Sequence, residues 1–179
     1  MRSRSLALLA TAAAAAFPSS ALADDQPAPA DQPTACLAAN GPASDSTSIR
    51  GVHVGGRAII KGADGSPLNA KSVKYCVAGG GVFSFALSTE QDVVLVLSTS
   101  TRDSIGPINP TSPAQSARME WPSMTRIAKT SSTAIYRIDA RRQLILGVAD
   151  GRVNFVAAAD RLLLEYPNKL GYYLHRLGF

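Results

Sequence analysis

Short runs in which apolar and polar residues alternate recur along most of the chain, and this period of two predicts β-strands. Residues 72–77 (SVKYCV) are a clear example, because Val73, Tyr75 and Val77 fall on one face of a strand. Residues 92–99 (DVVLVLST) instead form a β-branched apolar run bounded by polar residues, which indicates a buried strand. Together with weaker runs, these patterns predict a mainly β fold, an antiparallel sandwich or small barrel of about eight short strands.

The strongest hairpin signal lies between residues 144 and 157. Two runs of strand-forming residues, 144–149 and 152–157, are separated only by Asp150 and Gly151. An Asp-Gly pair accepts the positive φ angles that a tight two-residue turn requires. We therefore expect these two runs to pair as neighbouring antiparallel strands.

The last part of the chain fits two kinds of structure. Residues 157–166 contain Ala, Leu, Arg and Glu, which suit a helix, but the run also fits a further strand, which we favour. Residues 169–179 place leucines at helical spacing and so predict one C-terminal helix, yet they also carry apolar residues at alternate positions up to Phe179. The second pattern is typical of the closing strand of an outer-membrane barrel, although Gly171 and His175 interrupt it.

Residues 100–119 form a long gap between the predicted strands. Three prolines, with Asn, Thr and Ser, predict that this segment has no regular structure. A loop of this length inside a domain is often functional, so we expect the contact surface of the protein here. Trp121 follows the segment, and Arg118 and Arg126 flank that tryptophan. These three residues are our candidate binding residues for an anionic partner.

The N-terminal residues predict export. Residues 1–23 have the three parts of a secretory signal peptide: early arginines, a short Ala- and Leu-rich run, and small residues at Ala21 and Ala23. Residues 24–34 are rich in Pro, Ala, Gln and Asp, which predicts a disordered leader. Residues 35–179 are then a single β-rich domain with no transmembrane span after processing. The mature protein is expected in the periplasm or the extracellular medium.

Cys36 and Cys76 are the two cysteines of the chain, and in an exported protein an even number predicts one disulfide bond between them. A redox pair would more often have the CxxC spacing, which is absent. A metal site would require more Cys or His than the two of each present here. The sequence therefore predicts a structural bridge, with no metal and no cofactor.

The net charge of +5 changes the expected partner rather than the fold. Between residue 24 and Arg50 the chain has four acidic residues and no basic one, which leaves the remainder of the predicted domain basic. A basic surface favours an anionic glycan or an anionic protein of the envelope or the extracellular space. The basic residues are spread along the chain, so no specific binding of nucleic acid is expected.

Catalytic residues cannot be assigned from the pattern. His53 and His175 are the first candidates for acid–base work, but no GxSxG motif is present and the glycine run before Ser84 is a weak signal. We therefore expect an exported, non-catalytic binding module of a bacterial-type cell envelope. The alternative is a secreted or periplasmic hydrolase of cell-wall, polysaccharide or ester substrates, which would place one histidine beside a serine or carboxylate in a cleft.

Overall fold

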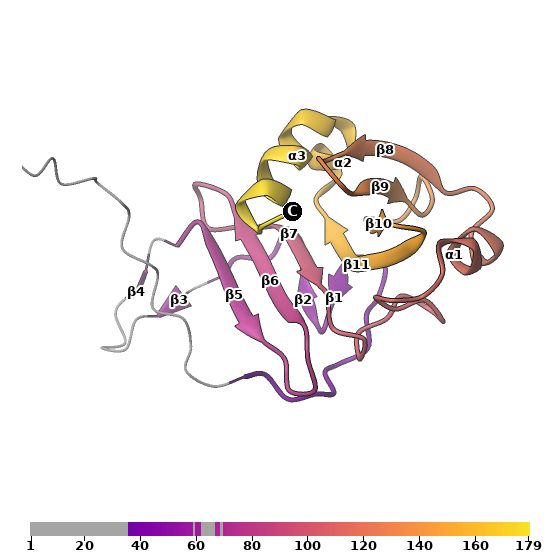
Figure 1. Ribbon diagram of the computed structural model, residues 1–179. Helices are drawn as coiled ribbons and strands as arrows, with labels where there is room; N and C mark the ends of the chain where they lie inside the picture. Colours follow the sequence, from indigo (N-terminus) through magenta and orange to yellow (C-terminus); the bar gives the residue numbers. More distant parts are fainter. Residues whose placement is uncertain (1–35, 59, 62–66, 69) are drawn as a thin grey trace, which may run out of the picture.

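One seven-stranded antiparallel sheet organises the described residues, which are 36–58, 60–61, 67–68 and 70–179 of the computed structural model (Figure 1). The strand order across the sheet is β5-β6-β7-β11-β10-β9-β8. Two short hairpins, β1–β2 and β3–β4, lie outside the sheet. The strands are β1 (Ser48–Ile49), β2 (Val52–His53), β3 (Ile60–Lys61), β4 (Pro67–Leu68), β5 (Ser72–Cys76), β6 (Val82–Leu87), β7 (Val93–Ser98), β8 (Thr125–Lys129), β9 (Ala134–Arg137), β10 (Leu144–Ala149) and β11 (Arg152–Ala159).

The predicted mainly β, antiparallel fold is therefore confirmed. The predicted signal peptide (1–23) and leader (24–34) lie outside the described residues.

Two consecutive meanders build this sheet. Strands β5 to β7 form the first meander, β8 to β11 form the second, and the antiparallel β7–β11 ladder joins them. The predicted hairpin is β10–β11, in which Ala149 pairs with Arg152 across the turn. Asp150 and Gly151 in that turn have φ angles of 49° and 74°, so the sequence prediction is confirmed in position and in turn chemistry.

The sheet carries a hydrophobic core on each face. The first core lies against β1 and the segment 105–117, which contributes Ile105, Ile108 and Ala117. The second core lies against α2 (Arg161–Glu165) and α3 (Pro167–Arg176). In β7, the side chain of Val96 belongs to the first core, while the neighbouring leucines belong to the second. This strand is buried on both faces, as its apolar run predicted.

The C-terminal residues form a helix, α3, so the helical spacing of the leucines describes the structure and the alternating strand pattern over residues 169–179 does not. In α3, the side chains of Leu170 and Leu174 point into the second core, and Pro167 occupies a first-turn position that tolerates proline. The strand prediction for residues 157–166 is wrong beyond Ala159. The side chain of Asp160 accepts a hydrogen bond from the backbone N–H of Leu162, and this N-cap starts α2.

The expectation of no regular structure over residues 100–119 is also wrong in its last part, where α1 (Ala114–Glu120) forms. Pro113 is the N-cap of this helix, so it precedes the helical hydrogen bonds and interrupts none of them. The residues that follow Pro113 are mostly good helix formers, and Ala117 packs into the first core. None of the helices in the described ranges is long and apolar enough to cross a membrane.

A close aromatic contact ties the chain end to the second core. A Cβ atom at Gly147 of β10 would overlap the ring of Phe155 on β11, so this ring packs directly on the glycine backbone. The Phe155 and Phe179 rings meet edge to face, with centroids 4.9 Å apart. Residue 147 therefore accepts no side chain without a shift of Phe155.

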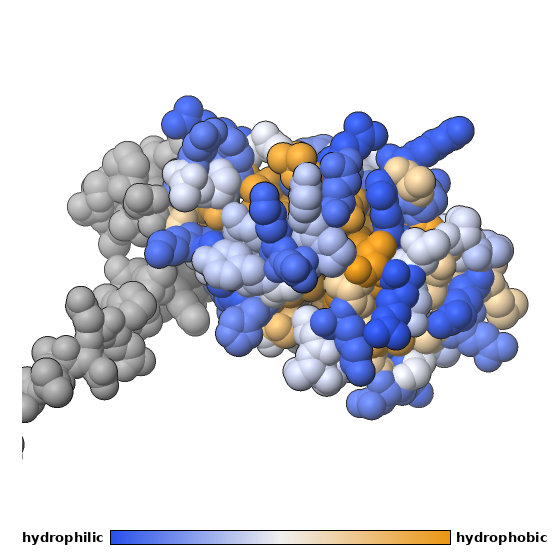
Figure 2. All heavy atoms as spheres, turned by 90° about the horizontal axis from the view of Figure 1, so that it is seen from above, coloured by the Kyte–Doolittle hydropathy of each residue, from blue (hydrophilic) through white to orange (hydrophobic). Residues whose placement is uncertain are grey.

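The surface around α2 and α3 combines basic and aromatic side chains. Lys169 lies over the Tyr166 ring at 4.9 Å, and Arg176 lies over Tyr172 and Tyr173, at 5.5 Å from each ring centroid. Figure 2, which views the molecule from above Figure 1, shows hydrophilic side chains over most of this side, with small hydrophobic patches between them.

Candidate functional site

The structure brings Arg118 to the ring of Tyr136. Arg118 lies in the last turn of α1, and its guanidinium carbon is 5.4 Å from the centroid of the Tyr136 ring in β9. Arg118 Nη2 also donates a hydrogen bond of 3.2 Å to the Tyr136 hydroxyl oxygen. Helix α1 is thereby connected to the second meander through a cation and an aromatic ring.

Arg126 approaches the same tyrosine from β8. Arg126 and Tyr136 are directly opposite each other in the β8–β9 ladder, so their side chains share one face of the sheet. Arg118 and Arg126 are both exposed, and neither forms an ion pair with any described residue. Tyr136 therefore has two exposed arginines as neighbours, Arg118 in contact with its ring and Arg126 opposite it in the ladder, and neither is neutralised by a described carboxylate. We call Arg118, Tyr136 and Arg126 the arginine–tyrosine cluster.

Trp121 does not point outward with these residues. It is the C-cap of α1, it is half-buried, and it packs against the first core. Its ring atom Cζ2 lies 3.6 Å from where a Cβ atom of Gly106 would be. The indole thus holds the segment before α1 against the core. Sequence reasoning missed Tyr136, because its position opposite Arg126 follows from the β8–β9 pairing and its contact with Arg118 joins residues 18 apart.

A second polar centre was not predicted at all: a buried ion pair between Arg50 and Asp103. Arg50 Nη1 lies 2.9 Å from Asp103 Oδ1, and the two side chains are 5% and 3% exposed. Ser98 Oγ also donates a hydrogen bond to Asp103 Oδ2 and accepts one of 3.1 Å from the backbone N–H of Ser100. The pair joins residues 53 apart in sequence, which no local pattern indicates.

The backbone at Arg50 is unusual. Arg50 and Gly51 form the turn of the β1–β2 hairpin, with φ angles of 54° and 73°. Glycine, asparagine or aspartate would normally occupy the first of these positions, because a larger side chain is strained at positive φ. The bonds to Asp103 hold the arginine there, so strain and ion pairing occur at one residue.

Residues 36–44, which we call the strap, cross over this ion pair. Cys36 forms the predicted disulfide with Cys76 at the end of β5, which confirms that pairing. Leu37 exchanges backbone hydrogen bonds with Cys76 and Ala78, at 2.9 and 2.8 Å. Arg50 Nη2 donates to the carbonyl oxygen of Ala38, so the strap is fixed at its start and above the ion pair.

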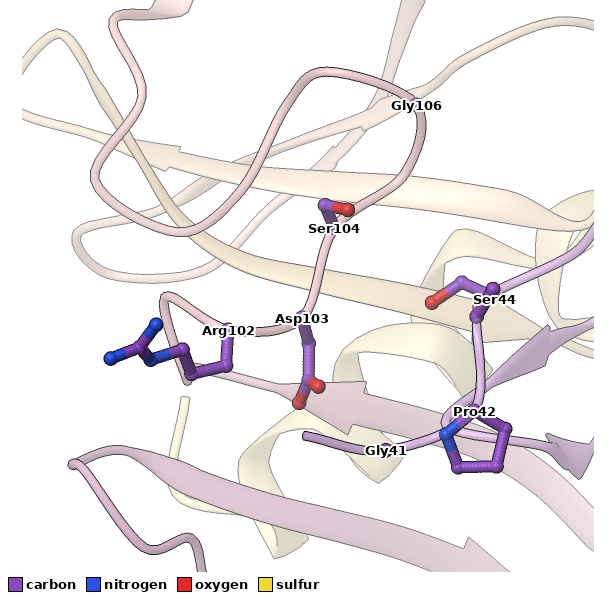
Figure 3. Close-up of a pocket in the computed structure, with 8 residues that line it drawn as sticks. Gly41, Pro42, Ser44, Arg102, Asp103, Ser104 and Gly106 are labelled. Atoms are coloured by element: carbon purple, nitrogen blue, oxygen red, sulfur yellow. The ribbon is translucent and has the colours of Figure 1, made fainter. Parts of the chain in front are cut away.

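Pockets lie on both sides of the strap. One, of about 290 Å³, is lined by Gly41 to Ser44 and by residues of the loop that carries Asp103. Figure 3 shows the hydroxyl groups of Ser44 and Ser104 pointing into this space, while the Arg102 side chain points away from it. The other, of about 370 Å³, lies between the strap and the aromatic residues of β5 and β6.

The histidines occupy ordinary surface positions. His53 Nδ1 lies 3.2 Å from Thr47 Oγ1 and 3.8 Å from Asp45 Oδ2, with both ionisable side chains about half-exposed. The backbone N–H of Thr47, which donates to the carboxylate, is the main cause that lowers the pKa of Asp45. His53 lines neither strap pocket. His175 is exposed on α3, and Ser84 is buried in β6.

Among the described residues, no three His, Cys, Asp or Glu side chains come together as metal ligands would. Searches against protein-family models, curated proteins and solved structures found no match to this chain. Function is therefore inferred from the residues themselves.

Proposed function

We propose that this protein is an exported, non-catalytic binding module of the cell envelope, and that the arginine–tyrosine cluster holds an anionic glycan or protein. The observation that carries the proposal is a pair of exposed arginines without an ion pair among the described residues, Arg118 in contact with the Tyr136 ring and Arg126 opposite Tyr136 in the β8–β9 ladder. The predicted signal peptide and the Cys36–Cys76 bridge support export, because structural disulfides persist outside the cytoplasm.

Guanidinium groups bind carboxylates, sulfate esters and phosphate esters well, because their planar N–H groups donate two parallel hydrogen bonds to two oxygens. The cluster is also carried by regular elements: Arg118 by α1, Arg126 by β8 and Tyr136 by β9. The tyrosine ring and its hydroxyl orient Arg118 before any partner arrives. Less side-chain freedom is then lost on binding, which raises affinity.

The test measures binding to two polyanions, dextran sulfate and polygalacturonate, by isothermal titration calorimetry at 50 mM NaCl. We expect the double variant Arg118→Ala/Arg126→Ala to bind at least ten-fold more weakly than the wild type. The matched control is Arg102→Ala/Arg161→Ala, which removes the same charge from two other exposed arginines. Equal losses in both double variants would reduce the effect to net charge and refute a defined site.

A hydrolase is the second candidate, and the position of His53 beside Thr47 and Asp45 favours it. A carboxylate near one ring nitrogen would orient the imidazole and leave Nε2 to act as a base. The test is hydrolysis of p-nitrophenyl acetate by the wild type and by His53→Ala, with His175→Ala as the matched control. Turnover that only His53→Ala abolishes would support the hydrolase and contradict the non-catalytic proposal.

A further inference from the structure

The apolar pocket beneath the strap is separate from the arginine–tyrosine cluster. Its volume of about 370 Å³ falls within the range of small-molecule sites, about 300–1,000 Å³. Phe83 and Phe85 of β6 line its deepest part, since these residues are only 2% and 6% exposed. Tyr75 of β5 and Val52 of β2 are half-buried and complete the lining on the sheet side. Aromatic and aliphatic surfaces thus face one concave space.

The opposite wall of the pocket is the strap, which is held in place by several bonds. The Cys36–Cys76 bridge and the backbone bonds of Leu37 fix its start, and Arg50 holds the Ala38 carbonyl. A Cβ atom at Gly41 would lie 2.6 Å from Arg50 Nε, so the strap runs directly against the guanidinium. These contacts prevent the strap from closing onto the aromatic residues. The pocket therefore exists before any ligand binds.

The charges in the lining indicate what the pocket accepts. Among the described residues, Arg50 is the one charged side chain that lines it, and the carboxylate of Asp103 already neutralises this arginine. An ionic ligand would therefore lose its hydration without gaining a counter-charge. Tyr75 can still contribute a polar contact, because its hydroxyl makes no hydrogen bond to any described residue. We propose that this pocket binds a small uncharged ligand with an aromatic or short aliphatic body and at most one hydrogen-bonding group.

The first test uses N-phenyl-1-naphthylamine, an uncharged probe whose fluorescence rises in apolar surroundings. The change Val52→Phe fills the pocket from β2, and we expect at least a ten-fold loss of probe affinity. The matched control is Val54→Phe, because Val54 is also half-buried against the first core but does not line the pocket. Probe affinity within two-fold of wild type in Val52→Phe would overturn the proposal.

A second variant avoids any change to the core. Asn40 is an exposed strap residue at the pocket rim, so Asn40→Trp blocks the opening without affecting packed residues. Its control is Ala43→Trp, because Ala43 is an exposed strap residue that lines the other pocket. We expect loss of probe binding in Asn40→Trp alone. Equal loss in both tryptophan variants would place the probe elsewhere and overturn the proposal.

Two further measurements distinguish this pocket from the arginine–tyrosine cluster and from a groove for the protein's own N-terminal residues. The Arg118→Ala/Arg126→Ala variant is expected to bind the probe as the wild type does, so failure of the polyanion proposal does not affect this one. A chain that begins at residue 35 is expected to bind the probe equally well. A marked rise in affinity in that shorter chain would assign the pocket to residues 24–34 and overturn the proposal.

Discussion

The buried guanidinium of Arg50 depends on the carboxylate of Asp103, and the change Asp103→Asn tests that dependence. Asparagine keeps the side-chain shape but removes the charge and one acceptor oxygen. Asp103 accepts hydrogen bonds of 2.9 and 3.2 Å from Arg50 Nη1 and a further one from Ser98 Oγ. With only 5% of its side chain exposed, Arg50 would remain charged and poorly solvated. We expect the free energy of unfolding to fall by about 3–5 kcal/mol, as when a buried pair loses one partner.

Urea unfolding, followed through the fluorescence of Trp121, measures this loss. With a denaturant slope of about 2 kcal/mol per molar urea, the transition midpoint is expected to fall by about 2 M. The matched control is Asp139→Asn, which weakens the 3.1 Å pair with Arg142, whose side chain is 49% exposed. An exposed pair contributes about 0–1 kcal/mol, so a much smaller shift is expected there.

Equal midpoint shifts in Asp103→Asn and Asp139→Asn would refute the dependence of Arg50 on its buried partner. A double variant, Arg50→Met/Asp103→Leu, provides a further check, because it removes both charges together. We expect it to be more stable than Asp103→Asn alone, since no uncompensated charge remains buried. Equal stability of these two variants would show that the charge of Arg50 is not the cause of the loss.

Three further predictions concern the bridge, the glycine in β10 and the surface carboxylate. Cys76→Ser is expected to lower the free energy of unfolding by about 4 kcal/mol in the loop-entropy description, because the bridge joins cysteines 40 residues apart; a urea midpoint unchanged from that of the oxidised wild type would contradict this. Gly147→Ala is expected to cost about 1–3 kcal/mol by calorimetry, because a Cβ atom there overlaps Phe155; an unchanged melting temperature would exclude the close packing. The pKa of Asp45 is lowered in the folded protein, chiefly by the Thr47 backbone hydrogen bond. Its stabilising contribution is therefore fully present above the unfolded-state pKa, near 4, and is lost as the pH falls through the lower folded value. The stability difference between wild type and Asp45→Asn should shrink as the pH falls below the unfolded-state pKa, and a difference that stays constant from neutral pH into acid would contradict the assignment.

Local chemistry explains which elements were predictable. The β10–β11 hairpin follows from Asp150-Gly151 between two strand-forming runs, because the turn and the pairing depend on adjacent residues. Helix α1 does not follow from the sequence pattern, because three prolines in one segment predict irregular structure, whereas Pro113 stands at the N-cap and leaves the helix intact. The boundary between β11 and α2 depends on one capping aspartate, Asp160. The apolar residues before it suit either a strand or a helix, so the sequence pattern does not locate this boundary.

The candidate sites were less predictable, because both depend on contacts between distant residues. Arg118 and Arg126 were identified from their positions beside Trp121, but their relation to Tyr136 follows from the register of β8 and β9. Arg50 was not identified at all, since an arginine in a tight turn is unfavourable until Asp103 binds it. The disulfide was predictable because two cysteines in the chain allow one pairing.

Because one ladder joins the two meanders, the chain can be cut between them into two fragments that each keep a complete meander. Each meander contains its own sequence-adjacent pairings, and β7–β11 is the ladder that connects them. Pro122 and Ser123 lie between the meanders and are exposed, so a break between them interrupts no strand. We expect two separately expressed fragments that meet at this break to reassociate through the β7–β11 ladder. At concentrations too low for the fragments to associate alone, recovery of structure would then report the proximity of two partners fused to them.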